Sequence, residues 1–201
     1  MDRKPGRPRA LTVDVIAQAA LDDGIATFSM PSVARRLGVA HSGLYRYIED
    51  RDDLLVRALD RAIEAATWPD ADCSWEELLR AIGETIWHMC EEHVGLDEAA
   101  LSAPRSPRAV EHRIEKYIES IQHQGFLLED AAVSVEFVIT LALTASAEMR
   151  RLHRIEAAHT AGPSLPVLKA YDTEEVWRGR GWYARKLDIV LAGLAQRRIE
   201  P

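Results

Sequence analysis

A short stretch of polar and aromatic residues carries the side chains best suited to bind another molecule. Seven positions between 41 and 51 could contact phosphates or base edges: His41, Ser42, Gly43, Tyr45, Arg46, Tyr47 and Arg51. Guanidinium, imidazole and hydroxyl groups are the donors that proteins direct at nucleic acids. These residues can act together only if one folded surface presents them, so the elements around them must be considered next.

Two short helical patterns about one tight turn surround this stretch. The apolar residues that repeat at helical spacing are Val33, Ala34 and Leu37 in the first pattern and Leu44 and Ile48 in the second, which starts at about His41. Gly38 can supply the positive φ that ends a helix. The pattern indicates a helix-turn-helix, whose second helix enters the major groove, and its outward residues are therefore predicted to face DNA.

The same stretch resembles the helix-turn-helix signature of the TetR family of bacterial regulators. The residues that carry the resemblance are, in order, Leu37-Gly38-Val39, Leu44-Tyr45, Tyr47, Arg51 and Leu54-Leu55. It covers roughly residues 10–60, and the closing segment WYARKLDIVLAGLAQRR is similar to the last helix of many such proteins. The resemblance implies an all-α fold, in which a fourth helix joins a three-helix DNA-binding head to a helical effector-binding and dimerisation body.

The resemblance also implies a function and roles for residues. The expected protein is a repressor, not an enzyme, that binds a palindromic double-stranded operator as a homodimer. A small apolar or aromatic effector would release it. Tyr45, Tyr47 and Arg51 are expected on phosphates, and the residues expected near base edges or flanking phosphates are His41, Ser42 and Arg46. For Arg51, an ion pair with Asp53 is the structural alternative.

The sequence departs from the family pattern at the starts of both helices of the motif. Ala40 stands where relatives often carry a capping Ser or Thr, and a missing cap costs roughly 0.5–2 kcal/mol. Ser42 is close enough in sequence to substitute, although a side chain inside the first turn is poorly placed for it. Met30 and Pro31 replace a Thr and a charged residue, so phosphate contacts are not expected from them.

The net charge of −7 is divided unevenly along the chain. Residues 1–51 hold eight Arg or Lys against six Asp or Glu, and the remainder holds 17 against 26. A local basic surface is sufficient for attraction to phosphate. The N-terminal arm is the most basic part, with Arg3, Lys4, Arg7 and Arg9. It could follow the minor groove of DNA or form a solvated terminus.

Helices flank the motif on both sides. Thr12 is a good N-cap for a helix over 13–23 that ends at Gly24, and Asp50 caps a fourth helix that ends before Pro69. The predicted organisation is an arm and helix-turn-helix domain over 1–50, a connecting helix over 51–67 and an effector-binding and dimerisation domain over 68–201.

The remainder of the chain is also predicted to be helical. Apolar residues repeat at helical spacing over 75–92, about 96–102, from Val110 to Gly125, over 129–153 and over 182–196. The last two segments are the best candidates for a dimer interface, which in the final helix would use Tyr183, Leu187, Val190, Leu191 and Leu194. An ordinary intrachain core is the alternative. Residues 154–171 contain Gly162, Pro163 and Pro166 and are predicted to form a loop.

Several body residues are of the types that line small-molecule sites between helices. The candidate effector contacts are Trp87, His88, Tyr117, Phe137, Thr140, Thr144 and Trp177. Taken singly, each of them fits a core position better than a ligand contact. Together they favour an apolar or aromatic effector, whose identity the sequence does not indicate.

Motifs for other functions are missing from the sequence. It contains no glycine-rich phosphate loop, serine elbow or His-Glu zinc motif, and His88, Cys90 and His93 lack the further pairs of a zinc site. No metal or cofactor is expected. Because no run of about 18 uncharged apolar residues occurs, a cytoplasmic protein without a membrane partner is expected. A helical small-molecule-binding protein or enzyme that keeps the head for other contacts is the second hypothesis.

Overall fold

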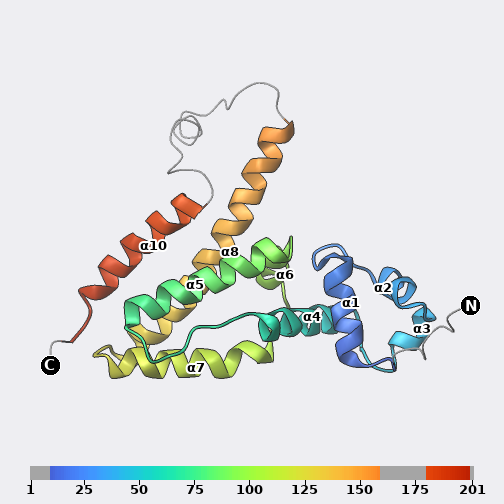
Figure 1. Ribbon diagram of the computed structural model, residues 1–201, viewed down its shortest axis with the longest axis horizontal. Coiled ribbons are helices and arrows are strands. Elements are labelled where there is room, and N and C mark those ends of the chain that lie inside the picture. The colour runs from blue at the N-terminus through green and yellow to red at the C-terminus, as the bar shows by residue number, and fades with distance from the viewer. Residues whose placement is uncertain (1–9, 159–179, 200–201) are drawn as a thin grey trace, which may run out of the picture.

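The computed structural model describes residues 10–158 and 180–199, and every regular element within these ranges is a helix (Figure 1). The helices are α1 (Val13–Gly24), α2 (Met30–Leu37), α3 (His41–Leu44), α4 (Arg51–Ala65), α5 (Trp75–Glu92), α6 (Leu96–Leu101), α7 (Arg108–His123), α8 (Leu128–Ala158) and α10 (Arg180–Ala195). The prediction of an all-α fold with a helix-turn-helix head is confirmed. The basic arm with Arg3, Lys4, Arg7 and Arg9, residues 159–171 of the predicted loop and Trp177 lie outside the described residues. The first part of that loop, 154–158, instead continues α8, because the helix breakers Gly162 and Pro163 come only later in the chain.

Helices α1, α2 and α3 form the head at one end of the molecule (Figure 1). Ile16, Phe28 and Val33 are almost fully buried between them. The predicted Thr12 cap is present, since its side chain accepts a hydrogen bond from the Val15 N–H. The start of α2 is held by Ser29, whose hydroxyl accepts from the Ser32 N–H while the Ser32 hydroxyl accepts from the Ser29 N–H.

Helix α3 is shorter than the second helix that the sequence predicts. It covers only four residues and is followed by a turn over 45–47, although the Ile48 N–H still donates to the Leu44 carbonyl. No side chain caps its N-terminus at Ala40, so Ser42 does not substitute for the missing cap. The uncapped start and the conformational freedom of Gly43 both weaken a helix here.

Helix α4 leaves the head and reaches the body. Asp50 caps it as predicted, accepting from the Asp53 N–H at 2.8 Å. The helix packs on α1 in the head and on α7 and α6 in the body. At its far end, the Trp68 indole N–H donates to the Ile63 carbonyl at 2.8 Å. The connecting helix is therefore attached to both parts of the molecule.

The body is built around α8, which packs on α5, α6, α7 and α10. By length and composition alone, Leu128–Arg151 would be sufficient to cross a membrane, although charged residues interrupt it. However, 44% of its most apolar window is buried inside the chain, and Val135, Val138 and Ala142 are fully enclosed. The buried residues share one face of α8, which is the pattern of a helix packed on a core.

Helix α10 turns the residues that were predicted for a dimer interface toward its own chain. Four members of the predicted stripe are buried: Tyr183, Leu187, Leu191 and Leu194. They belong to the intrachain core, which was the alternative interpretation. Ile189 lies on the opposite side of α10 and is 69% exposed. Any partner of α10 must therefore contact the outward face and not the predicted stripe.

Candidate nucleic-acid interface

The α3 segment and its turn separate polar from apolar side chains cleanly. Leu44 and Ile48 are buried against the head core, as predicted. The side chains of His41, Ser42, Tyr45, Arg46 and Tyr47 are exposed, and Gly43 is partly covered. For the two tyrosines the exposed fractions are 50% and 40%, which are high for aromatic residues. The fold thus places these sequence-predicted contacts on one continuous outward surface.

His41 and Tyr45 contact each other on this surface. Their rings meet edge to face with 5.2 Å between centroids, and the Tyr45 hydroxyl lies 3.4 Å from His41 Nε2. The two residues are one helical turn apart, where side chains become neighbours. The contact limits the rotamers of both residues, so that a histidine and a phenol point outward together.

Arg51 is held in place by the head and does not pair with Asp53. Its Nε donates to the Phe28 carbonyl at 3.4 Å, and its guanidinium lies 4.9 Å from the centre of the Phe28 ring. Both contacts orient the side chain at the start of α4, where it remains exposed. Among the described residues, the partners of Asp53 are other groups, so the alternative role for Arg51 is not observed.

Asp53 is one of the few buried acidic residues in the described part of the chain, whereas the sequence suggested for it only an ion pair with Arg51. Its carboxylate accepts from the Glu49 N–H at 3.1 Å, from Arg57 Nε at 3.0 Å and from an Arg105 guanidinium nitrogen at 2.9 Å. Burial by itself would raise the pKa of Asp53, but these hydrogen bonds outweigh it and hold the pKa below the ordinary value of 3.8. The role of Arg105 had no signal in the sequence, because it depends on a contact 52 positions away.

The candidate effector residues are not gathered in one place. Trp87 is buried, stacks on Tyr183 with 5.1 Å between ring centroids and donates to Glu91. Tyr117 is also buried and donates to the Pro69 carbonyl. His88 is exposed beside Glu91 and Glu92. Of the α8 candidates, Phe137 and Thr144 are exposed and Thr140 is partly exposed.

Two cavities of the body border some of these residues. One of about 360 Å³ lies between the end of α4, α5 and Arg180, and is lined by Ala65, Ala66, Thr67, Glu84, Thr85, His88, Met89, Glu92 and Arg180. A second, of about 300 Å³, lies between the segment after α4 and α7 and includes Tyr117. Their volumes are at the lower end of the range for small-molecule sites. Phe137, Thr140 and Thr144 line neither of them.

The residues considered for a metal site are separated as well. Cys90 is buried, and burial raises the pKa of its thiol to about 12, whereas the His88 side chain is 65% exposed. Within residues 10–158 and 180–199, no three His, Cys, Asp or Glu side chains are grouped closely enough to hold a metal ion.

Comparison with solved structures decides the fold. ActR from Streptomyces coelicolor, a TetR family protein solved in complex with actinorhodin, superposes with a TM-score of 0.75 at 22% identity, covering 96% of this chain and 99% of that one. A TetR variant from Acinetobacter baumannii in complex with minocycline gives 0.73 at 16% identity, covering 94% and 99%. The chain has the fold of the TetR family.

By sequence, the chain is similar to HTH-type transcriptional repressors. An HTH-type transcriptional repressor of Mycobacterium tuberculosis is 29% identical over 163 residues, which are 75% of this chain and 61% of the relative. The repressor DrrR1 of Streptomyces coeruleorubidus is 27% identical over 168 residues, 80% of this chain and 62% of DrrR1. The chain thus spans less than two thirds of the length of these relatives. No family model matches the sequence.

Proposed function

We propose that this protein is a ligand-responsive transcriptional repressor that binds a palindromic operator as a homodimer in the cytoplasm. Residues 1–50 would form the DNA-binding domain, 51–67 the connecting helix and 68–201 the effector-binding and dimerisation domain. The observation that carries the proposal is the exposed α3 surface, whose histidine, tyrosines and arginine stand outward from a closed three-helix core. The sequence relatives named as repressors support the same function.

On this proposal the contacts divide by role. Tyr45, Tyr47 and Arg51 bind phosphates and set the register of the head on the duplex. His41, Ser42 and Arg46 stand nearest the base edges, with Gly43 allowing close approach of the backbone. The arm residues Arg3, Lys4, Arg7 and Arg9 would add phosphate or minor-groove contacts, as basic arms do in other DNA-binding domains.

The outward face of α8 and α10 is the proposed dimer interface. Val133 and Phe137 on α8 and Ile189 on α10 are 62%, 43% and 69% exposed, which is unusual for such residues. Thr140 and Thr144 continue the same side of α8, and Ala192 and Gly193 continue that of α10. Small and apolar residues on paired helices suit close two-fold packing. Phe137, Thr140 and Thr144 therefore fit this interface better than an effector site.

The effector is proposed to enter the cavity of about 360 Å³ at the end of α4. Ala65, Ala66 and Met89 give it apolar walls, and His88 is the candidate effector residue that reaches it. A ligand that prefers another position of α4 would change the separation of paired heads, which is a population shift worth roughly 1–3 kcal/mol. The ligand complexes of ActR and TetR support an effector of this general kind.

Selection of bound fragments from randomised DNA by the purified protein, at two salt concentrations, tests the proposal. A recovered palindrome whose binding weakens steeply with salt is the expected result. Recovery of no motif at either concentration would contradict it. In that case the second hypothesis, a helical ligand-binding protein or enzyme, would become the better description.

A further inference from the structure

Asp53 joins three separate parts of the molecule through one carboxylate. Oδ2 accepts from the N–H of Glu49, which lies just after the 45–47 turn, and from Arg57 within α4. Oδ1 accepts from Arg105, which belongs to the segment between α6 and α7 in the body. Asp53 is only 4% exposed. A carboxylate is buried at low cost only when it is fully paired in this way.

The hydrogen bond to Glu49 is not needed to cap α4. Asp50 already caps that helix. An acid at the third position of a helix normally reaches back to the N–H of the capping residue itself. Asp53 reaches one residue further, to Glu49, and so holds the residues that follow the 45–47 turn against α4. This hold matters because α3 has only four residues and no side-chain cap at its start.

Arg105 reaches Asp53 from a segment that is fastened on both sides. Before it, the Ser102 hydroxyl donates to the carbonyls of Glu98 and Ala99 and closes α6. After it, the Ala109 N–H donates to Asp60 of α4 at 2.9 Å. Arg105 is therefore positioned by α6 of the body on one side and by a contact with α4 on the other, although its side chain is 55% exposed.

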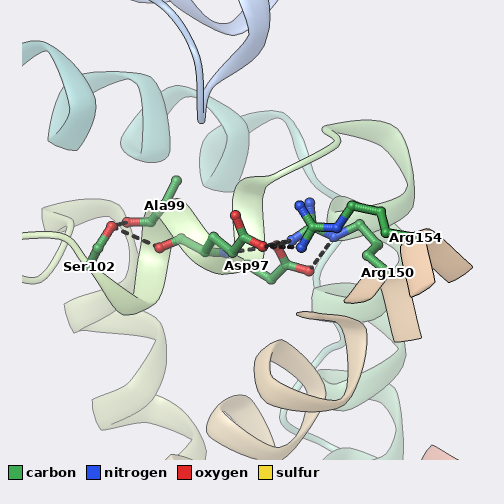
Figure 2. A network of polar contacts seen from close by, with 6 residues as sticks. Asp97, Ala99, Ser102, Arg150 and Arg154 are labelled. Atoms are coloured by element: carbon green, nitrogen blue, oxygen red, sulfur yellow. Dashed lines mark hydrogen bonds and ion pairs between the residues drawn. The ribbon is translucent and has the colours of Figure 1, made fainter. Parts of the chain in front are cut away.

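The start of α6 is bound to α8 (Figure 2). Asp97 of α6 is fully buried and accepts two hydrogen bonds from Arg150, one of them from Nε at 3.0 Å. Glu98 adds ion pairs with Arg150 and Arg154 at 3.4 and 3.3 Å. Polar contacts thus fix α6 to α8, Arg105 to Asp53 and Asp53 to Glu49. The backbone itself joins α6 to Arg105, and Glu49 to the turn that carries Tyr45 and Tyr47.

We propose that Asp53 is a positioning residue through which the body, by way of Arg105, sets the orientation of the DNA-contacting turn. Arg57 keeps the carboxylate in place within α4. The hydrogen bond from Arg105 forms or breaks as the body moves relative to α4. When the body moves Arg105 away, the carboxylate loses one of its two arginines and its hold on the Glu49 N–H loosens. The effect on DNA binding rests on the proposed function. The link from Arg105 through Asp53 to Glu49 does not.

Hydrogen exchange in the DNA-free protein tests the structural step. Removing the arginine with Arg105→Gln is expected to speed exchange of the amides over 45–50, the Glu49 amide most. The matched control is Arg108→Gln, which removes the same charge from an exposed neighbour in the first turn of α7. Arg105→Lys keeps the charge and is expected to recover most of the protection. The thermal midpoint should fall in Arg105→Gln, because the buried carboxylate loses one of its partners, and stay near that of the wild type in Arg108→Gln and Arg105→Lys. Exchange over 45–50 is therefore compared with that of the α1 amides in the same variant.

Operator binding tests the consequence, with the DNA sequence selected by the wild type as probe. Arg105→Gln is expected to change affinity by about 2- to 30-fold, the range of single residues along coupled networks, with Arg108→Gln close to the wild type. Unchanged exchange over 45–50 in Arg105→Gln, equal effects of the control, or no recovery by lysine would each overturn the proposal. If the wild type selects no operator, the proposed function fails, whereas the exchange result still decides the role of Asp53.

Discussion

The head and the body use the same types of side chain in opposite ways. In the head, Tyr45 and Tyr47 stand outward from a closed core and are 50% and 40% exposed, so they add little to it. In the body, Trp87 and Tyr183 are buried and stacked, and they contribute to the core. An exposed aromatic residue needs a functional explanation, whereas a buried one is accounted for by packing. Burial, rather than residue type, therefore separates candidate contacts from structural residues here.

The largest effect is expected from a charge on the outward face of the body. Ile189→Asp places a carboxylate at the proposed two-fold interface, so the dimer should separate and operator binding should be lost. Val94→Asp is the matched control, because Val94 is 71% exposed and lies before α6, away from that face. Sedimentation velocity would give the oligomeric state. A variant that remains dimeric would show that the body, unlike the head, leaves apolar residues exposed without function.

A second prediction concerns the core of the body at Gly83, against which the Tyr183 hydroxyl packs. A Cβ at this position would overlap with Tyr183 Oη and lie 3.2 Å from Val138 Cγ1. Gly83→Ala should therefore lower the free energy of unfolding by about 1–3 kcal/mol, as overpacking does. Denaturant titration measures the loss.

The control for that prediction is Tyr183→Phe. The Tyr183 hydroxyl is buried and finds no hydrogen-bond partner among the described residues, so its removal should change stability little. In the double variant, the phenylalanine should relieve part of the Gly83→Ala loss, with a coupling of about 0.5–3 kcal/mol. Strictly additive losses would mean that the two residues do not compete for the same space.

In the head, two exposed residues should affect DNA binding in different ways. Arg51→Ala should weaken binding to all sequences alike and lower the salt slope by about 1, because a phosphate contact is lost. His41→Ala should change sequence preference by about 1–3 kcal/mol at one position. Binding titrations on the selected operator and on single-base variants at several salt concentrations measure both. The reverse pattern would contradict the assigned roles.

The smallest effect is the pH dependence carried by Asp53. Because its pKa is held below 3.8 in the folded protein, the group contributes stability above that pH and loses it as the pH falls through the folded pKa. The stability difference between wild type and Asp53→Asn should therefore shrink as the pH falls below about 3.8. Urea titrations between pH 3 and 6, roughly, would measure it. Asp52→Asn, which removes an exposed acid from the same turn, is the matched control.

Much of the head could be predicted from the sequence because its determinants are local. The Thr12 and Asp50 caps, the positive φ of Gly38 and the inward Leu44 and Ile48 all follow from spacing over a few residues. The predicted length of α3 was wrong: the missing cap at Ala40 was visible in the sequence, but its effect on where the helix ends was not. The outward set at 41–47 was predictable because helical geometry fixes which side chains oppose the buried ones.

The body shows what only the tertiary structure decided. The sequence determined that α8 and α10 are helices with apolar faces, but the choice of the face that turns to the chain itself depends on how α5, α7 and α8 pack. The same holds for Asp53 and Arg105, which are 52 positions apart, and for Asp97 and Arg150, which are 53 apart. Periodicity reports the neighbours of a residue within its own helix. Contacts between helices depend on crossing geometry and side-chain volume, which are properties of the packed molecule.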